Sequence, residues 1–267
     1  MSLPSALGDG FVVAKRNLIK IKRVPDLLVF TTLQPIMFVL LFAYVFGGAI
    51  NVKGSNYREY LMAGIFAQTV VFGATITGAG LAEDIQKGII DRFRSLPMSP
   101  TAVLFGRTLS DVLNNVLVVI VMSLTGLAIG WRIHTSLVEA LAGFLLLLCF
   151  AYAFSWVMAM VGLMAPSPEV VNNAAFIVIF PLTFVANTFV PISTLAEGPL
   201  RTFAEWNPVS AVTEAARQLF GNIPPGTPAP DSWALQHPAT YTLLWSLAIL
   251  VIFVPLSTRQ FRRSVSR

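Results

Sequence analysis

Long, uninterrupted runs of apolar residues constrain this chain more than any other feature of its sequence. Residues 140–164, ALAGFLLLLCFAYAFSWVMAMVGLM, contain no charged side chain, and similar runs recur along the 267 positions. A helix of about 20 such residues crosses the ~30 Å hydrocarbon core of a bilayer. Only 12% of the residues are charged, about half the ~25% that is typical of soluble domains. The sequence therefore predicts an all-α integral membrane protein.

The apolar runs divide into six predicted transmembrane helices within one domain, residues 1–267. Their approximate ranges are 27–49, 60–82, 108–130, 137–164, 169–191 and 239–258. Four glycines inside these runs are expected to let neighbouring helices approach closely, because they lack a Cβ. They are Gly64, Gly73, Gly78 and Gly80.

Three segments outside the predicted spans have helical patterns of their own. Residues 1–26 mix apolar side chains with several bases, as expected of an amphipathic helix that lies in the membrane interface. Residues 83–100 are a charged connection between the second and third spans. Residues 195–220 divide into two helices too short to span, and Asn207 and Pro208 suit the start of the second one. We predict that this pair forms an external re-entrant or interfacial hairpin.

The basic residues are distributed unevenly. Thirteen of the eighteen Lys and Arg residues fall near the N-terminus, in the connection between the second and third spans, or near the C-terminus. Cytoplasmic flanks of membrane proteins carry such an excess. We therefore predict cytosolic termini and a cytosolic 83–100 segment, with the net charge of +5 reflecting topology rather than nucleic-acid binding. The single cysteine, Cys149, allows no intrachain disulfide and no cysteine-based metal site, and no cleavable signal peptide is expected.

The 83–100 segment, EDIQKGIIDRFRSLPMSP, has an amphipathic pattern. Ile85, Ile89, Phe93 and Leu96 recur at helical spacing, and charged residues occupy the other sides. One interpretation is a solvated connector. The other is a helix that docks its apolar face in a groove on a partner, which explains why the connection exceeds the ~2–8 residues that usually join two helices.

Several motifs of catalysis and transport are missing from the sequence. There is no G-x-x-x-x-G-K-[ST] loop to hold ATP phosphates and no G-x-S-x-G motif, and only two histidines are present. We therefore expect neither an enzyme nor a metal site. Few charges fall inside the spans, which also argues against an ion-driven carrier.

Polar residues inside the spans have two interpretations. Each can form a hydrogen bond between helices, or it can line a pathway for an amphipathic solute. The preferred pathway candidates are two adjacent pairs and two residues near the predicted outer end of the fifth span: Asn114, Asn115, Asn172, Asn173, Asn187 and Thr188. Arg107 and Asp111, four residues apart, are expected to form a local pair at the start of the third span.

Three stretches resemble the permease subunits of type-2 ABC transporters, in the branch of daunorubicin and doxorubicin resistance exporters. They are QPIMFVLLFAYVFGGAI at 34–50, KGIIDRFRSLPMSPTAVLFGRTL at 87–109, and the region from NTFVPISTL to NPVSAVTEAARQLFGN at 187–222. The resemblance extends from about residue 11 to residue 262. It departs from the family at Gln86, where many relatives carry a charged residue.

The resemblance implies a half-transporter in a bacterial cytoplasmic membrane. A second permease copy, identical or closely related, would complete it, and two separate ATP-binding subunits would hold ATP and magnesium, so that this chain needs no cofactor. The 83–100 segment would be the coupling segment, which contacts those subunits through ten residues: Glu83, Asp84, Lys87, Gly88, Asp91, Arg92, Phe93, Arg94, Leu96 and Pro97.

The implied function is export of a hydrophobic or amphipathic small molecule, such as an antibiotic. Within the family, export of a polysaccharide or a lipid-linked glycan is the alternative. A secondary transporter or channel that needs no ATPase is the alternative from another class.

Overall fold

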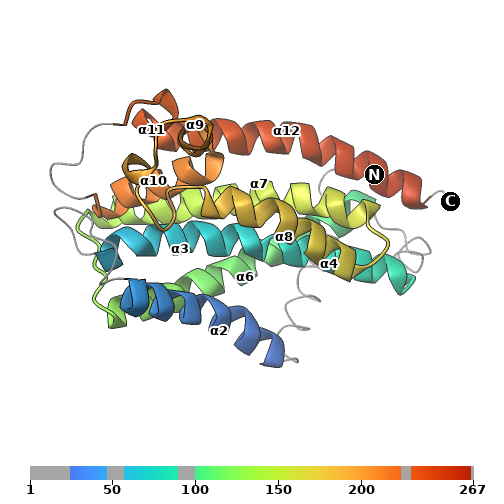
Figure 1. Ribbon diagram of the computed structural model, residues 1–267. Coiled ribbons are helices and arrows are strands. Elements are labelled where there is room, and N and C mark those ends of the chain that lie inside the picture. Colours follow the sequence, from blue (N-terminus) through green and yellow to red (C-terminus); the bar gives the residue numbers. More distant parts are fainter. Residues whose placement is uncertain (1–24, 47–56, 90–99, 224–229, 266–267) are drawn as a thin grey trace.

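The computed structural model is a bundle of helices that run roughly along one axis (Figure 1). It describes residues 25–46, 57–89, 100–223 and 230–265. Within these ranges every long regular element is a helix, as the sequence predicts. Residues 1–24 of the predicted interfacial helix lie outside the described residues.

Four helical segments are long and apolar enough to cross a membrane. They are the pair α3 (Tyr57–Gly73) and α4 (Thr75–Gln86), then α6 (Pro100–Ala128), α7 (Leu137–Met164) and α12 (Pro238–Val265). Two shorter apolar helices correspond to the first and fifth predicted spans. They are α2 (Pro25–Leu41), which continues into the π-helical turn η1 (Phe42–Phe46), and α8 (Pro168–Phe184). Six crossings and the orientation of the termini therefore stay predictions.

Local sequence explains where several helices begin. Ser136 and Glu139 form a reciprocal capping box at the start of α7, and this helix covers the predicted 137–164 range. By contrast, α6 begins at Pro100, eight residues before the predicted 108. Proline suits the first turn of a helix because its missing N–H would have no partner there.

The fifth predicted span ends earlier than expected. Helix α8 stops at Phe184, not at residue 191, and residues 185–191 form turns instead. Their backbone groups bond to distant residues of the chain. The carbonyls of Asn187 and Phe189, for example, accept hydrogen bonds from the hydroxyls of Tyr60 and Tyr57. An apolar composition alone does not reveal these partners.

Small helices gather at one end of the bundle, here called the hairpin end (Figure 1). They are η2 (Ile192–Thr194), α9 (Pro199–Trp206), α10 (Pro208–Phe220) and α11 (Trp233–Gln236). Asn207 caps α10 as predicted, because its side chain accepts a hydrogen bond from the Val209 N–H at 2.9 Å. The opposite end, which holds residues 83–89, is called the coupling end. Whether the hairpin re-enters the membrane stays a prediction.

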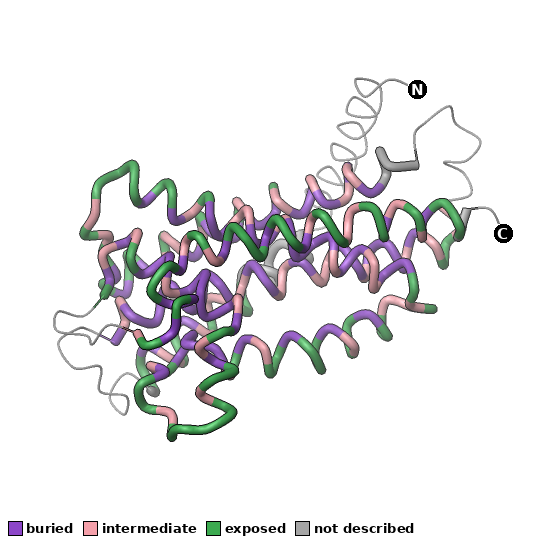
Figure 2. Tube along the Cα trace, turned by 90° about the horizontal axis from the view of Figure 1, so that it is seen from above, coloured by how far each residue is buried: buried purple, intermediate pink, exposed green. Residues whose placement is uncertain are grey.

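The core lies where α3, α7 and α10 meet. Phe66, Trp131 and Phe220 pack edge-to-face with ring centroids 5.5–6.0 Å apart, and Trp131 Nε1 donates a hydrogen bond to Asn222 Oδ1 at 2.8 Å. Burial follows this arrangement (Figure 2): buried residues face one another inside the bundle, and exposed residues cover the outer helices. The most apolar window of α3–α4 is 72% buried, whereas that of α12 is 17% buried. Helix α12 therefore presents most of its surface to the surroundings.

The four glycines allow close approach, as predicted. A Cβ on Gly64 would lie 1.9 Å from the Thr188 carbonyl oxygen, and one on Gly78 would lie 2.5 Å from the Met158 carbonyl oxygen. Gly73 and Gly80 similarly accommodate side chains of α6. Any larger residue would force these elements apart or move the side chain that fills the space.

Candidate functional site

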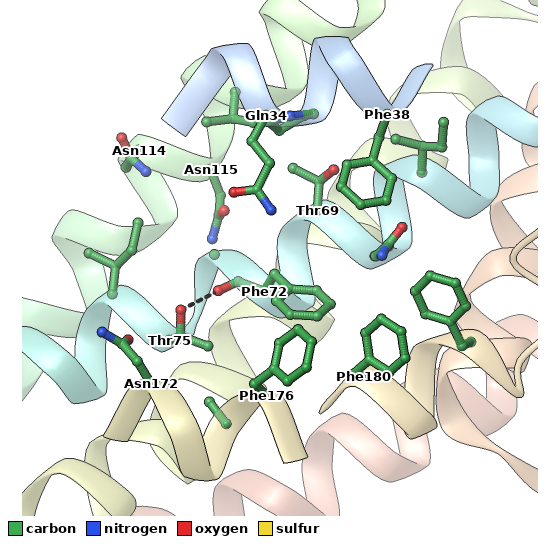
Figure 3. A pocket seen from close by; sticks show the side chains of 18 residues that line it. Gln34, Phe38, Thr69, Phe72, Thr75, Asn114, Asn115, Asn172, Phe176 and Phe180 are labelled. Carbon is green, nitrogen blue, oxygen red and sulfur yellow. Dashed lines mark hydrogen bonds between the residues drawn. The ribbon is translucent and has the colours of Figure 1, made fainter. Parts of the chain in front are cut away.

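A cavity of about 360 Å³ lies between α2, α3, α4, α6 and α8 (Figure 3). None of its 18 lining residues is charged. The polar ones are amides and hydroxyls: Gln34, Gln68, Thr69, Thr75, Asn114, Asn115 and Asn172. The remainder are apolar, with five phenylalanines among them. Such a lining can accept both an apolar surface and a few hydrogen-bonding groups.

The long span breaks at the wall of this cavity. Helix α3 ends at Gly73 and α4 begins at Thr75. The break frees backbone groups, which need partners inside a membrane. Thr75 Oγ1 supplies one, because it donates a hydrogen bond to the Phe72 carbonyl at 2.7 Å (Figure 3). The Asn115 amide lies against Gly73, where a Cβ would be 2.4 Å from Asn115 Oδ1. The break therefore brings polar groups to the middle of the bundle.

Three of the six predicted pathway residues line the cavity. Asn114 and Asn115 are 8% and 2% exposed, and Asn172 faces them from α8 across the broken span. Gln34 of α2 points toward Asn115 (Figure 3). Among the described residues, Asn115 Nδ2 has no hydrogen-bond partner. This buried donor is available to a bound solute.

The other three predicted pathway residues do not line the cavity. Asn173 lies on an exposed side of α8. Asn187 and Thr188 are 4% and 0% exposed. The side chain of each donates a hydrogen bond within the chain, whereas Asn187 Oδ1 has no hydrogen-bond partner among the described residues. The Asn187 side chain donates to Glu214 at 3.0 Å, and the Thr188 hydroxyl donates to the Thr183 carbonyl at 2.8 Å. Whether they line an exit stays a prediction.

A row of aromatic rings forms one wall of the cavity. Phe176, Phe180 and Phe184 follow one another at four-residue intervals along α8, with centroids 4.9 and 4.1 Å apart. The sequence interpretation did not single them out. Their spacing in FIVIFPLTF is the signal that could have done so, because residues four apart share a helix face.

A buried cluster of charges lies between the cavity and the coupling end. Arg107 Nη1 of α6 donates to Asp84 Oδ2 of α4 at 3.3 Å, and both side chains are nearly buried. Arg107 was expected to pair with Asp111 along its own helix. It reaches α4 instead, because Gly80 leaves room: a Cβ there would lie 1.2 Å from Arg107 Nη2. Asp111 is 4% exposed and lies one turn before Asn114 and Asn115.

The coupling segment is described only at its start. Glu83 and Asp84 belong to the last turn of α4, which ends at Gln86, so no separate helix begins at residue 83. Glu83 and Lys87 form an ion pair at the surface, and the hydrogen bond raises the pKa of the Lys87 ammonium. Gly88 has a φ of +64°, a left-handed conformation that typically ends a helix.

The predicted contacts of this segment stay predictions. Asp84 is 5% exposed and directed at Arg107 rather than at a surface. Six predicted coupling residues lie outside the described residues: Asp91, Arg92, Phe93, Arg94, Leu96 and Pro97. Within the part of the chain that is described, no three His, Cys, Asp or Glu side chains are grouped so that they could hold a metal ion.

Comparison with known proteins agrees with this architecture. A model of the ABC-2 type transporter family matches residues 10–220. The daunorubicin resistance ABC transporter permease protein DrrB1 of Streptomyces coeruleorubidus is 33% identical over 247 residues, which cover 92% of this chain and 83% of that protein. The doxorubicin resistance ABC transporter permease protein DrrB of Mycobacterium tuberculosis H37Rv is 27% identical, covering 79% and 72% of the two chains.

A more distant relative is the putative transport permease ycf38 of Cyanophora paradoxa. It is 25% identical over 255 residues, or 91% of this chain and 84% of that protein. The family match covers most of the sequence, and the apolar helices fit a protein that crosses the membrane several times. This chain therefore belongs to the ABC-2 type transporter family, as a multi-pass permease homologous to drug-resistance permeases.

Proposed function

We propose that this permease exports an amphipathic small molecule through the cavity, using ATP hydrolysed by a separate subunit. The observation that carries the proposal is the uncharged lining of amides and phenylalanines at the middle of the bundle. A solute with a flat apolar face and a few polar groups matches both halves of that lining. The names of two relatives, which refer to daunorubicin and doxorubicin resistance, support the same substrate class.

The source of energy follows from the family and from the missing phosphate loop. In this proposal, two ATP-binding subunits dock on the coupling segment from the cytosol, and a second permease copy completes the transporter in a bacterial cytoplasmic membrane. The chain itself has no catalytic role. The docking residues are the ten named above except Asp84, which is buried against Arg107. Phe93 and Leu96 fill apolar pockets, and the charged residues around them set the register.

The charge cluster supplies a mechanical link between docking and cavity. The last turn of α4 is the start of the coupling segment, and the Asp84–Arg107 ion pair ties α4 to α6. Helix α6 carries Asn114 and Asn115 into the cavity. A displacement of the coupling segment therefore moves both helices together and changes the position of the amides. Rigid transmission of this kind requires that the ion pair stays closed, and its burial favours that.

Export of a glycan is the second candidate within the family. A glycan presents hydroxyl groups on all sides, and each one needs a partner when it leaves water. The cavity offers seven polar side chains, six of which come from α2, α3, α4 and α6 rather than from α8, the helix of the three phenylalanines. This distribution favours an amphipathic solute over a uniformly polar one.

The test is transport into inside-out vesicles that contain the permease with its ATP-binding subunit. Doxorubicin is the probe, and its uptake is followed by fluorescence quenching. We expect uptake that requires ATP and stops when the phosphate-loop lysine of the partner is replaced. Uptake driven by a proton gradient without ATP would support a secondary transporter instead. ATP-dependent uptake of a lipid-linked glycan, without doxorubicin uptake, would support the second candidate.

A further inference from the structure

A pair of stacked phenylalanine rings lies next to the cavity on the side of the hairpin end. The last lining rings in that direction are Phe38 of α2 and Phe184 of α8. Beyond them, Phe42 of η1 stacks on Phe189 with centroids 4.2 Å apart and planes 15° apart. Phe42 also stacks on Phe38, and Phe189 contacts Phe184 at 5.1 Å. Rings at these distances are in van der Waals contact, so a solute cannot pass between them unless they separate.

The ring row of α8 leads directly to this pair. Phe176, Phe180 and Phe184 succeed one another along the cavity wall, and Phe189 continues the series after α8 has ended. A flat apolar surface can therefore keep contact with aromatic rings from the middle of the bundle to the stacked pair. The described residues offer the solute no comparable row toward the coupling end, where Asp84, Arg107 and Asp111 lie buried.

The Phe189 half of the pair is fixed from behind. The carbonyls of three successive residues accept hydrogen bonds from buried donors: Asn187 from the Tyr60 hydroxyl and from Arg217, Thr188 from Arg217, and Phe189 from the Tyr57 hydroxyl. Arg217 is 1% exposed, and its guanidinium lies 3.5 Å from the centroid of the Tyr60 ring. Residues 187–189 are thereby bound to both α3 and α10.

Phe42 lies in an element that is less firmly held than the segment around Phe189. Phe42 belongs to a π-helical turn, a wider and rarer geometry that occurs often at functional sites. On the far side of this turn, Tyr44 and Val45 are 60% and 62% exposed. Tyr44 contacts the Arg58 guanidinium, which lies 4.9 Å from the centroid of its ring. This exposed contact is easier to break than the buried hydrogen bonds behind Phe189.

We propose that Phe42 and Phe189 form the gate through which a solute leaves the cavity, with η1 as the moving side. Arg217 is the positioning residue that holds the Phe189 side still. That this gate serves export rests on the proposed function. The contact between Phe42 and Phe189, and the hydrogen bonds that hold the Phe189 side, are properties of the fold. The gate can therefore be tested without a transport assay.

The test measures how fast a membrane-impermeant maleimide labels Thr69→Cys, a cavity position that faces the space in Figure 3. The permease is kept with its ATP-binding subunits, without nucleotide, in right-side-out and inside-out vesicles. Leu200→Cys, 56% exposed on α9, identifies the vesicles whose hairpin end faces the reagent. Labelling of each cysteine is quantified by peptide mass spectrometry. Native Cys149, half-buried on α7, reports loss of structure.

Opening the gate should accelerate labelling from the hairpin side only. In both Phe42→Ala and Phe189→Ala, we expect Thr69→Cys to react at least about tenfold faster, with Cys149 unchanged. Phe144→Ala is the matched control, because it removes a partly buried ring from the core beside Phe220; its rate should stay within about twofold. An unchanged rate in Phe42→Ala, or equal acceleration in the control, would overturn the gate.

Arg217→Met and Arg217→Lys test the positioning role. The first removes the guanidinium hydrogen bonds to the Asn187 and Thr188 carbonyls and leaves the one from the Tyr60 hydroxyl. The second keeps a charge that can reach these carbonyls. We expect faster labelling of Thr69→Cys in Arg217→Met, partial recovery in Arg217→Lys, and no change at Cys149. Equal acceleration at Thr69→Cys and Cys149 would mean general unfolding and would overturn the positioning role. Failure of the vesicle transport test would contradict the export function. It would not affect the labelling results, which test the gate alone.

Discussion

Gly80→Ala is the most informative single substitution in this chain, because its effect on stability should reverse sign with the residue at position 107. A Cβ at position 80 would lie 1.2 Å from Arg107 Nη2, 2.3 Å from its Cζ and 3.0 Å from its Nε. The guanidinium therefore has to leave its place. Its departure breaks the 3.3 Å hydrogen bond to Asp84, a carboxylate that is only 5% exposed.

The magnitude follows from two opposing effects. A hydrogen bond between charged groups contributes about 1.5–3 kcal/mol, and burial of this pair leaves little solvent screening. Replacing a helical glycine by alanine stabilises by about 0.5–1 kcal/mol through the unfolded state. We expect Gly80→Ala to lower the free energy of unfolding by about 1–2 kcal/mol, since the lost ion pair outweighs the gain in helix propensity. In the Arg107→Ala background the space beside position 80 is empty. There Gly80→Ala should raise the free energy of unfolding by about 0.5–1 kcal/mol.

The assay is equilibrium unfolding in mixed micelles of increasing sodium dodecyl sulfate content, followed by tryptophan fluorescence. The four proteins of the cycle are the parent, each single variant and the double variant. The difference between the two Gly80→Ala effects is the coupling energy between the positions. A substitution that is neutral or stabilising in the parent, or that has one sign in both backgrounds, would refute the packing of Arg107 over Gly80.

Three further predictions address function and topology. Phe93→Asp should abolish ATP-driven efflux while the protein still inserts in the membrane, because a charge cannot enter an apolar docking pocket; normal efflux with comparable membrane levels would contradict the docking hypothesis. Lys53→Cys and Arg267→Cys, in a Cys149-free chain, should react with an impermeant reagent from opposite sides of the membrane, and same-side labelling would contradict the topology. Asn114→Leu combined with Asn172→Leu should alter the ranking of exported substrates more than the binding of the ATP-binding subunit, and an unchanged ranking would return both residues to a structural role.

Several features could be predicted from short local patterns in the sequence. Ser136 and Glu139 mark the start of α7, and Asn207 marks the start of α10, because a helix cap depends on a few neighbouring residues. Asn114 and Asn115 were recognised as candidates because adjacent residues on a helix point in different directions. At least one amide of the pair must therefore point away from lipid.

Features that depend on distant residues were not predictable in the same way. The Arg107–Asp84 pair joins residues 23 positions apart on different helices, so the closer Asp111 was preferred on spacing alone. The break after Gly73 contains no proline, and its apolar surroundings read as one continuous span. Arg217 lies within the predicted external hairpin, residues 195–220, where nothing in the local sequence indicates that it is buried. Its burial follows from carbonyls that lie 29, 30 and 157 positions away.

This separation along the chain has a consequence for biogenesis. The Tyr60 carbonyl accepts a hydrogen bond from Arg217 Nε at 3.0 Å, across 157 positions. At a synthesis rate of about 5–20 residues per second, α3 waits roughly 10–30 s in the membrane before α10 has been made. The backbone around Thr188, once made, also lacks its cation until residue 217 has been added. A nascent chain interrupted before residue 217 thus contains most of its membrane helices but lacks the guanidinium that binds residues 60, 187 and 188. We expect proteases to cleave such products at the hairpin end faster than they cleave the finished permease.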